Sequence, residues 1–370
     1  MNQVATQNFL FVSPTAVLGG AERTMFNLIT KLLDDGNEVT LYIMSRGKQD
    51  SWNNLETHPN FKMIAKNFSS EKTSLPAFFI NLFLITWAEP YDYTFSSHTH
   101  VNGALSLMRK LKILRTNRLI SRESTFIFDR FEGLPRQLFK FIYRYMYGSQ
   151  DLVICQTDRM RSSLINSLGF KPSQNIQVIP NPVNMNYINK QLGLSDLTDK
   201  PYNRLIVSCG RFIPLKQFDI LVKAFESISV QFPDAGLVII GDGPEREKIE
   251  QLIKQLSLED KVILTGKISN PIKWFNKADI GIISSSIEGF PNVLLEMMAS
   301  GTKHIITTPC TDGVNNIPYI TVAHSTSEDS ISNTLRSCLA NPVDNSVNNQ
   351  KYIQDNRSVD IFWDRVQGLI

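Results

Sequence analysis

The sequence predicts an α/β protein built from two doubly wound domains, each with a parallel sheet. Short apolar runs alternate with amphipathic helical segments along the whole chain, and this alternation is typical of a parallel sheet covered by helices on both faces. The pattern is interrupted once, where "IQVIPNPVN" leads into a polar, irregular stretch. We therefore expect an N-terminal domain over 1–184 and a C-terminal domain over 185–355, with a helix of about 356–370 packing back on the first domain.

The N-terminal half begins with a strand and an amphipathic helix. The run "NFLFVS" (8–13) has the pattern of a buried strand, and 19–36 carries apolar residues at helical spacing up to Gly36. The apolar segment 75–90 is too short to span a bilayer comfortably, so we expect a buried helix there. Further strands are expected over 38–44, 91–97, 118–123 and 151–156.

The second half repeats this order of elements more regularly. We expect strands at "NRLIVSCG", "AGLVIIGDGP", "KVILTGKI", "ADIGIISSS" and "KHIITTP", and helices at "QFDILVKAFESISVQFP" and "EREKIEQLIKQLSL". In an open parallel sheet, ligands bind where loops leave the carboxyl ends of strands. The loops that follow these strands are therefore the places to look for a site.

Composition fits a globular protein of two domains. The 370 residues are 42% hydrophobic and 20% charged, with a net charge of +3. The four cysteines lack metal-binding or disulfide spacing, which predicts a reducing compartment. The N-terminus lacks the features of a signal peptide, so we expect a cytoplasmic location.

The stretch "SSSIEGFPNVLLEMMASG" carries two carboxylates in an otherwise apolar strand–turn–helix pattern. Glu288 precedes the turn, and Glu296 lies inside the helix that Pro291 is expected to open. N–H groups at the start of that helix would suit an anion or sugar hydroxyls. The alternative is that Glu288 caps the helix and Glu296 lies on an exposed stripe. The residues assigned to this ligand segment are Glu288, Gly289, Phe290, Pro291, Asn292, Val293 and Glu296.

A second loop contributes two cations. Arg211 follows a strand and Gly210, and Lys216 comes five residues later, just before a helix. A guanidinium and an ammonium in one strand-to-helix loop suit a diphosphate. Two solvated loop cations are the alternative for this loop taken alone.

Three weaker signals lie in other strand-end loops. Gly19 and Gly20 open the first helix and would allow close approach of a phosphate or sugar, although for this diglycine taken alone a plain turn is the favoured explanation. Gly241 lies in the turn "GDGPER", and the backbone of Lys267 and Ile268 could pair with a base edge.

Two histidines follow the expected strand over 91–97. His98 and His100 fall where a parallel sheet presents catalytic groups, and either could be the active-site histidine. The HxH spacing is also compatible with metal, but the sequence shows no third or fourth ligand, so no metal site is predicted.

Taken in order, "GGAER", "GRFIPLKQFD", "GDGPER" and "EGFPNVLLEMMASG" resemble one family. The chain resembles retaining glycosyltransferases of the GT-B fold, family 4, many of which build bacterial polysaccharides and lipid-linked oligosaccharides. The resemblance covers nearly the whole chain. It implies transfer of a hexose from a nucleotide diphosphate donor, expected to be a UDP-sugar, to a glycan or lipid-linked glycan with retention and without metal or other cofactor.

The resemblance also implies roles for individual residues. Arg211 and Lys216 would hold the donor diphosphate, and Glu296 the ribose hydroxyls. Glu288 and the backbone after it would hold the donor sugar and phosphate, Gly20 would approach the diphosphate, and His98 would lie near the reacting carbon. Many family members carry a Gly-Gly-x-x-Glu loop after Gly301. Here the loop over 308–320 has a single glycine and no such acid, so donor identity does not carry over.

Between Arg109 and Arg161, basic residues outnumber acidic ones and alternate with aromatic residues. This pattern predicts peripheral contact with anionic lipid, which places the protein at the inner face of the cytoplasmic membrane. A core-facing helix with a solvated basic face is the alternative, and nucleic acid is not expected because no binding motif accompanies the charge. Two other functions remain open: a non-catalytic nucleotide-sugar-binding subunit, and a GT-B-like epimerase or phosphorylase.

Overall fold

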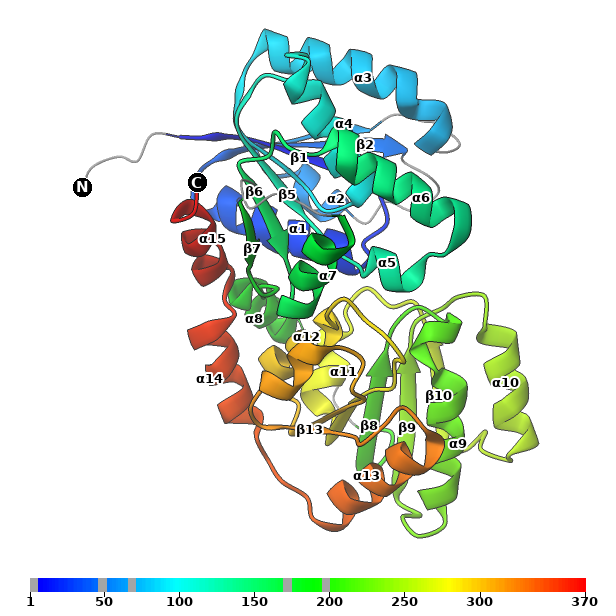
Figure 1. Cartoon of the computed structure of the whole chain (residues 1–370). Coiled ribbons are helices and arrows are strands. Elements are labelled where there is room, and N and C mark those ends of the chain that lie inside the picture. Colours follow the sequence, from blue (N-terminus) through cyan, green and yellow to red (C-terminus); the bar gives the residue numbers. More distant parts are fainter. Residues whose placement is uncertain (1–5, 46–51, 66–70, 169–174, 195–199) are drawn as a thin grey trace. The chain divides into compact units, whose positions relative to one another are not determined.

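The computed structural model describes residues 6–45, 52–65, 71–168, 175–194 and 200–370. The chain forms two compact units, coloured along the sequence in Figure 1. Unit 1 comprises Met1–Asn184 and Val359–Ile370, and unit 2 comprises Met185–Ser358. Each unit has its own sheet, and every strand ladder in the described ranges is parallel. The predicted doubly wound α/β class is confirmed.

Unit 1 is built on a seven-stranded sheet in the order β3-β2-β1-β4-β5-β6-β7. The central strands are almost wholly buried, which explains why they read as continuous apolar runs. The strands are β1 (Asn8–Thr15), β2 (Glu38–Ser45), β3 (Phe61–Ala65), β4 (Tyr91–Ser96), β5 (Thr116–Arg122), β6 (Leu152–Cys155) and β7 (Ile176–Val178).

Helices pack on both faces of this sheet because alternate side chains of each strand point to opposite sides. Leu10 and Val12 of β1 pack with Phe78 and Leu105 from the two helices α3 and α4. Phe9, which precedes Leu10, stacks instead on Tyr93. The helical elements are α1 (Gly20–Asp34), α2 (Asn53–Glu56), α3 (Glu71–Ala88), α4 (Thr99–Lys110), α5 (Ile127–Arg130), α6 (Gly133–Phe141), the π-helix η1 (Ile142–Met146), α7 (Asp158–Leu168) and α15 (Val359–Gln367).

The helix expected over 75–90 forms, but it is not buried as predicted. Phe78 and Leu82 of α3 are fully buried, whereas Ile80, Leu84 and Trp87 are 60%, 57% and 47% exposed. These three lie at i, i+4 and i+7, so they form one stripe on the outer side of the helix. The segment is apolar on all sides, and the sequence therefore did not reveal which side meets the sheet. None of the helices in the described part of the chain has the length and apolarity needed to cross a bilayer.

The C-terminal helix α15 belongs to unit 1. It begins at Val359, whose N–H donates to the Val183 carbonyl at 2.9 Å. Trp363 packs edge-on against Phe9 and Tyr93, with ring centroids 5.5 and 5.3 Å away. The chain thus returns to the sheet that it left at the end of β7.

Unit 2 has a six-stranded sheet in the order β10-β9-β8-β11-β12-β13. Its strands are β8 (Arg204–Cys209), β9 (Ala235–Ile240), β10 (Val262–Gly266), β11 (Ile280–Ile283), β12 (His304–Thr307) and β13 (Ile320–Val322). Its helices are α8 (Met185–Gly193), the 3-10 turn η2 (Pro214–Lys216), α9 (Phe218–Ser229), α10 (Arg246–Gln255), α11 (Ile272–Lys277), α12 (Asn292–Ser300), the 3-10 turn η3 (Asp312–Asn316), α13 (Glu328–Ala340) and α14 (Ser346–Asn356).

The core of unit 2 lies between the sheet and α9, α10 and α13. Phe212, Leu221, Phe225 and Ile239 are completely buried there. The helices α8, α11, α12 and α14 pack together as a second layer. Gly281 of β11 lets α12 approach closely, since a Cβ at this position would lie 2.6 Å from Met297 Sδ.

The turn after β9 requires glycine. Gly241 has φ of +136°, and a Cβ there would lie 1.9 Å from the Gly210 carbonyl oxygen. We expect Gly241→Ala to destabilise unit 2 by about 2–4 kcal/mol through backbone strain and steric clash. Thermal unfolding of the purified protein measures the loss.

Gly193→Ala is the matched control, because a Cβ at that exposed position meets no atom within 4 Å. This control should leave the melting temperature unchanged or slightly raised. Equal melting temperatures for Gly241→Ala and the wild type would contradict the close approach at residues 210 and 241.

Candidate active site

Each sheet reverses its winding once. In unit 1 the reversal falls between β1 and β4, and in unit 2 between β8 and β11. At such a point the loops after the two neighbouring strands leave in opposite directions and open a crevice at the carboxyl edge, where ligands of open α/β sheets bind. Most of the residues singled out from the sequence follow one of these four strands.

In unit 2, the loops after β8 and β11 bring Lys216 and Glu288 together. Lys216 Nζ forms an ion pair with Glu288 Oε1, and Ser285 Oγ donates to the same oxygen at 2.8 Å. Ser284 Oγ donates to the Lys216 carbonyl at 2.7 Å, so backbone as well as side chains joins the two loops. The side chains of Lys216 and Glu288 remain 21% and 18% exposed, which leaves them accessible to a ligand.

Arg211 lies in the same loop, and its side chain projects into solvent. Its side chain is exposed, and within the described residues its guanidinium makes no ion pair. The next residue, Phe212, is completely buried and packs on Phe218 with ring centroids 5.0 Å apart. This anchored phenylalanine fixes the backbone from which the arginine projects. The loop therefore presents two cations to an anion: Lys216, which is paired with Glu288, and the exposed Arg211.

The two carboxylates have different environments. Glu296 lies inside α12 and is 8% exposed, so the alternative that placed it on an exposed stripe is wrong. The helix itself begins at Asn292, with Pro291 as its N-cap residue. Phe290 is buried beneath the Arg357 guanidinium, which lies 5.5 Å from its ring centroid. The roles expected for Glu296, Asn292 and Val293 stay predictions.

The unusual loop over 308–320 packs directly on the ligand segment. Glu288 N–H donates to the Cys310 carbonyl at 2.9 Å, and Thr311 Oγ1 donates to the Gly289 carbonyl at 3.2 Å. Burial, together with the Glu288 carboxylate, raises the pKa of the Cys310 thiol to about 11. This loop thus supports the backbone that the resemblance assigns to donor binding, although it lacks the acid common in the family.

The remaining donor-site candidates in unit 2 follow β9 and β10. Gly241 N–H donates to the Gly266 carbonyl at 3.0 Å, which joins the ends of these strands. Lys267 comes directly after this contact and is exposed, and Ile268 is half-buried. Gly210 N–H donates to the Ile240 carbonyl at 2.9 Å, so the ends of β8, β9 and β10 are adjacent.

In unit 1, the residues after β1 and β4 also meet. Gly19 N–H donates to Glu22 Oε2 at 3.1 Å, which caps the start of α1, and Gly20 is the first residue of that helix. The other oxygen of Glu22 lies 3.1 Å from His98 Nε2. Glu22 is only 6% exposed, whereas His98 remains partly accessible as the N-cap residue of α4.

His98 is therefore held by a carboxylate at the switch point of unit 1. The imidazole rings of His98 and His100 have centroids 6.1 Å apart. In the described ranges no group of three or more His, Cys, Asp or Glu side chains is arranged as a metal site. Sequence reasoning missed Glu22, and its position three residues after Gly19 was the available signal.

A buried charged pair at the end of β5 was also missed. Arg122 and Glu123 are each 1% exposed. Arg122 Nη2 donates to Asn181 Oδ1 at 2.6 Å, and burial lowers the pKa of the guanidinium to about 10. The run "RLISRE" predicted the strand correctly, but nothing in it indicated that Arg122 and Glu123 are buried.

Two family models match this chain over almost its whole length. "Glycosyl transferases group 1" matches residues 196–357, and "Glycosyltransferase Family 4" matches residues 18–187. The chain belongs to the group 1 glycosyltransferases. The boundary between the two matches falls close to the boundary between unit 1 and unit 2.

Curated relatives and solved structures agree with this family. The chain is 30% identical over 173 residues to an N-acetylgalactosamine-N,N'-diacetylbacillosaminyl-diphospho-undecaprenol 4-alpha-N-acetylgalactosaminyltransferase of Campylobacter jejuni, covering 47% of this chain and 44% of that protein. It is 31% identical over 159 residues to the lipopolysaccharide core biosynthesis glycosyltransferase LpsD of Rhizobium meliloti, covering 43% and 44% of the two chains. The match thus spans less than half the length of each relative.

The fold is that of solved GT-B glycosyltransferases. The structure of Anabaena Alr3699/HepE in complex with UDP and glucose superposes with a TM-score of 0.77 at 16% identity, over 98% of both chains. The predicted GT-B architecture is confirmed.

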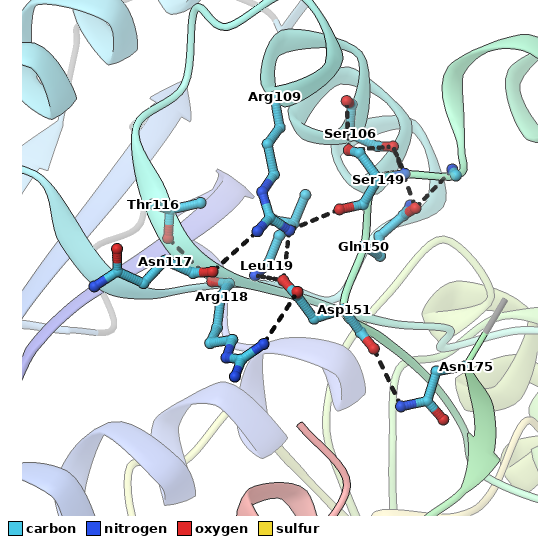
Figure 2. A network of polar contacts seen from close by, with 11 residues as sticks. Ser106, Arg109, Thr116, Asn117, Arg118, Leu119, Ser149, Gln150, Asp151 and Asn175 are labelled. Atoms are coloured by element: carbon cyan, nitrogen blue, oxygen red, sulfur yellow. Dashed lines mark hydrogen bonds and ion pairs between the residues drawn. The ribbon is translucent and has the colours of Figure 1, made fainter.

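Only part of the basic region of this glycosyltransferase is free to contact a partner. Figure 2 shows Arg109 in an ion pair with Asp151 and donating to the carbonyls of Ser149 and Asn117 at 2.7 and 2.9 Å. Asp151 also accepts from the Leu119 N–H at 2.7 Å and lies 3.5 Å from Arg118. These cations brace the amino ends of β5 and β6, so the expectation that the whole of Arg109–Arg161 faces lipid is too broad.

The outward-facing part of that region is α6 with η1. None of the residues of α6 is fully buried, but Phe139 packs against the core cluster that contains Phe128 and Tyr143, so one side of the helix faces the core and the remainder is exposed. Leu134, Leu138, Phe141 and Tyr145 are 86%, 59%, 54% and 57% exposed and lie at helical spacing. We name these four residues the α6 stripe. Arg136, Lys140 and Arg144 accompany it, and α6 and η1 contain no acidic residue.

The Cys310 thiol provides a test of the packing around Glu288. Because its pKa is about 11, the reactive thiolate is scarce at pH 8 in the folded protein, whereas an unfolded thiol with a pKa near 8.5 is substantially ionised. We expect iodoacetamide to label Cys310 at pH 8 about a hundredfold more slowly in the native protein than in urea, as measured by mass spectrometry. Equal rates would show that the loop carrying Cys310 is not packed on Glu288.

Proposed function

We propose that this protein transfers a hexose from a nucleotide diphosphate donor to a glycan or lipid-linked glycan acceptor, with retention at the anomeric carbon. The observation that carries the proposal is the pairing of Lys216 with Glu288 at the switch point of unit 2, beside the exposed Arg211. Cations and a carboxylate on adjoining loops suit a ligand that combines a diphosphate with sugar hydroxyls.

The donor is proposed to be a UDP-sugar bound by unit 2. The support is that HepE, which shares the fold, has been solved with UDP and glucose. Arg211 and Lys216 would hold the diphosphate, Glu288 the sugar hydroxyls, and Glu296 the ribose. The backbone from Gly289 to Val293 would line the same site, together with Gly210, Gly241, Lys267 and Ile268.

The rate acceleration is proposed to come mainly from stabilising the departing diphosphate. Breaking the bond between the anomeric carbon and the diphosphate oxygen places negative charge on the leaving group, and preorganised cations lower the energy of that charge in the transition state. Arg211 and Lys216 are held for this task by buried Phe212 and by Glu288. We propose that these side chains act without a metal ion, and transfer that persists in EDTA is the corresponding check.

Unit 1 is proposed to supply His98 and to bind the acceptor. Glu22 lies 3.1 Å from His98 Nε2 and fixes that edge of the ring, so the histidine can hold a hydroxyl or sugar in a defined orientation. Gly19 and Gly20 would allow close approach of the donor phosphate at the start of α1. Relatives named for undecaprenol-linked and lipopolysaccharide substrates support a glycan acceptor, and possible lipid linkage agrees with the α6 stripe.

The donor site is tested with two single variants. We expect Arg211→Ala and Lys216→Ala each to lower kcat by about ten- to a hundredfold, because each removes one charge-assisted contact to the leaving group. A thermal-shift screen of UDP-, GDP- and ADP-sugars selects the donor. Release of nucleoside diphosphate with an undecaprenyl-diphosphate-linked sugar then reports turnover.

Arg336→Ala and Lys254→Ala are the control variants, since both remove a cation elsewhere on unit 2: Lys254 is exposed, and Arg336 is partly exposed and donates to Gln231 and Asn333. They should retain full activity. Near wild-type turnover in both Arg211→Ala and Lys216→Ala would overturn the donor site. Product analysis separates the other functions: an epimerase needs no acceptor, a phosphorylase needs free phosphate, and a binding subunit shows no turnover.

Contact with anionic membrane is proposed to occur through the α6 stripe. Apolar side chains would enter the lipid while Arg136, Lys140 and Arg144 contact headgroups. We expect Leu138→Asp to reduce co-sedimentation with vesicles of phosphatidylglycerol and phosphatidylcholine by about tenfold at low salt, because it places a charge in the apolar stripe. Val347→Asp, at a 74% exposed site in unit 2, should bind as the wild type does. Unchanged binding of Leu138→Asp would remove this surface from the proposal.

A further inference from the structure

Unit 1 contains a buried carboxylate that accepts four side-chain hydrogen bonds and that the proposed reaction does not use. Glu123 is 1% exposed and follows β5 directly. Its Oε2 accepts from Thr99 Oγ1 and from Tyr143 OH, both at 2.7 Å. Its Oε1 accepts from Tyr147 OH at 2.5 Å and from Asn102 Nδ2 at 3.2 Å.

The direction of these hydrogen bonds is well defined. Burial, and then the Glu123 carboxylate, raises the pKa of Tyr143 and of Tyr147 well above the ordinary value, so both phenols keep their protons and donate them. A carboxylate removed from water needs such donors, because a buried charge without partners is strongly destabilising. Four donors hold it in one orientation.

Two of the donors come from the first turn of α4, which begins beside His98. His98 is the N-cap residue of this helix, and its carbonyl accepts from the Asn102 N–H at 2.8 Å. Asn102 also accepts from Ser96 Oγ at 2.5 Å, and its Nδ2 donates to the Arg122 carbonyl at 3.0 Å. Glu123 therefore fixes Thr99 and Asn102, and with them the backbone that carries His98.

The other two donors come from η1 and the residue after it. A π-helix is rare, and it is frequently found at functional sites. Here its wider turn brings Tyr143 and Tyr147 to the same carboxylate, while Tyr145 between them stays 57% exposed in the α6 stripe. Glu123 therefore connects η1, which carries part of the α6 stripe, to the first turn of α4, which follows His98.

We propose that Glu123 is a positioning residue for His98. Through Thr99 and Asn102 it sets the start of α4, so that the imidazole is held in the orientation needed for transfer, and through Tyr143 and Tyr147 it ties that orientation to η1. This inference rests on the proposed function, because it assigns a task to His98 in that reaction. It adds a buried residue that would act through His98 and not by its own contact with the substrate.

A purely structural role predicts a different pattern from a positioning role. If Glu123 acts through His98, its replacement lowers kcat in the wild type but has no further effect once His98 is removed. If it only stabilises the fold, its replacement has the same proportional effect in both backgrounds. A double-mutant cycle separates the two cases.

The cycle uses Glu123→Gln, His98→Ala and the double variant in the full chain. Glutamine keeps the shape of the side chain but removes the charge and two acceptor sites. We expect Glu123→Gln to lower kcat about tenfold while the KM for the nucleotide-sugar changes less than twofold, since the donor is proposed to bind unit 2. The double variant should match His98→Ala within a factor of two.

Tyr147→Phe is the second variant, because it removes one donor and leaves the carboxylate and its other three partners. It should show a smaller loss of kcat with the same non-additivity. Tyr319→Phe removes a hydroxyl from a 48% exposed tyrosine in unit 2 and serves as the matched control with full activity. If Glu123→Gln fails to fold, the cycle with Tyr147→Phe decides the question.

The outcomes separate this inference from the proposed function. Wild-type kcat in Glu123→Gln and Tyr147→Phe, or losses that multiply with that of His98→Ala, would overturn the positioning role while leaving transfer itself intact. An unchanged kcat in His98→Ala would overturn the positioning role as well, because His98 would then have no part in transfer for Glu123 to support. Absence of any sugar transfer by the wild type would instead refute the proposed function.

Discussion

The structure depends on one topological constraint, the single reversal of winding in each parallel sheet. Strands β8 and β11 are neighbours although more than seventy residues separate Lys216 from Glu288 along the chain. Because both strands run the same way, their carboxyl ends meet at one edge, and the loops that leave them turn to opposite faces. The ion pair is a consequence of this arrangement. In unit 1 the same rule brings Glu22, after β1, to His98, after β4.

The close approach of these loops requires glycine at particular positions. The carbonyl of Gly210 occupies the space that a Cβ on Gly241 would fill, and a Cβ on Gly210 would itself lie 3.2 Å from the Lys216 chain. The aliphatic part of Lys216 therefore rests on glycine backbone while its ammonium reaches Glu288. This close packing restricts the lysine to few rotamers, which reduces the entropy lost when an anion binds.

The sequence predicted what depends on periodicity and on local order along the chain. Alternating strands and helices gave the fold class, and Arg211, Lys216 and Glu288 were recognisable as strand-end residues in their loops. Periodicity carries no information about what lies outside a segment that is apolar on every side, so α3 was wrongly expected to be buried. Glu123 illustrates a different limit. Its four partners come from α4, from η1 and from Tyr147 directly after η1, and nothing near Glu123 in the sequence indicates that these elements converge.

The pairing of Lys216 with Glu288 has a consequence for how an anion would bind. A lysine already compensated by a carboxylate attracts a diphosphate less strongly than a free one, whereas Arg211 is exposed and forms no ion pair with any residue that the structure describes. Under the proposed function, an incoming diphosphate would therefore meet the arginine first and would have to compete with Glu288 for the lysine. When the ammonium turns to the phosphate, Glu288 is left to accept hydrogen bonds, and sugar hydroxyls are suitable donors. Binding of the diphosphate would thus free Glu288 to bind the sugar hydroxyls.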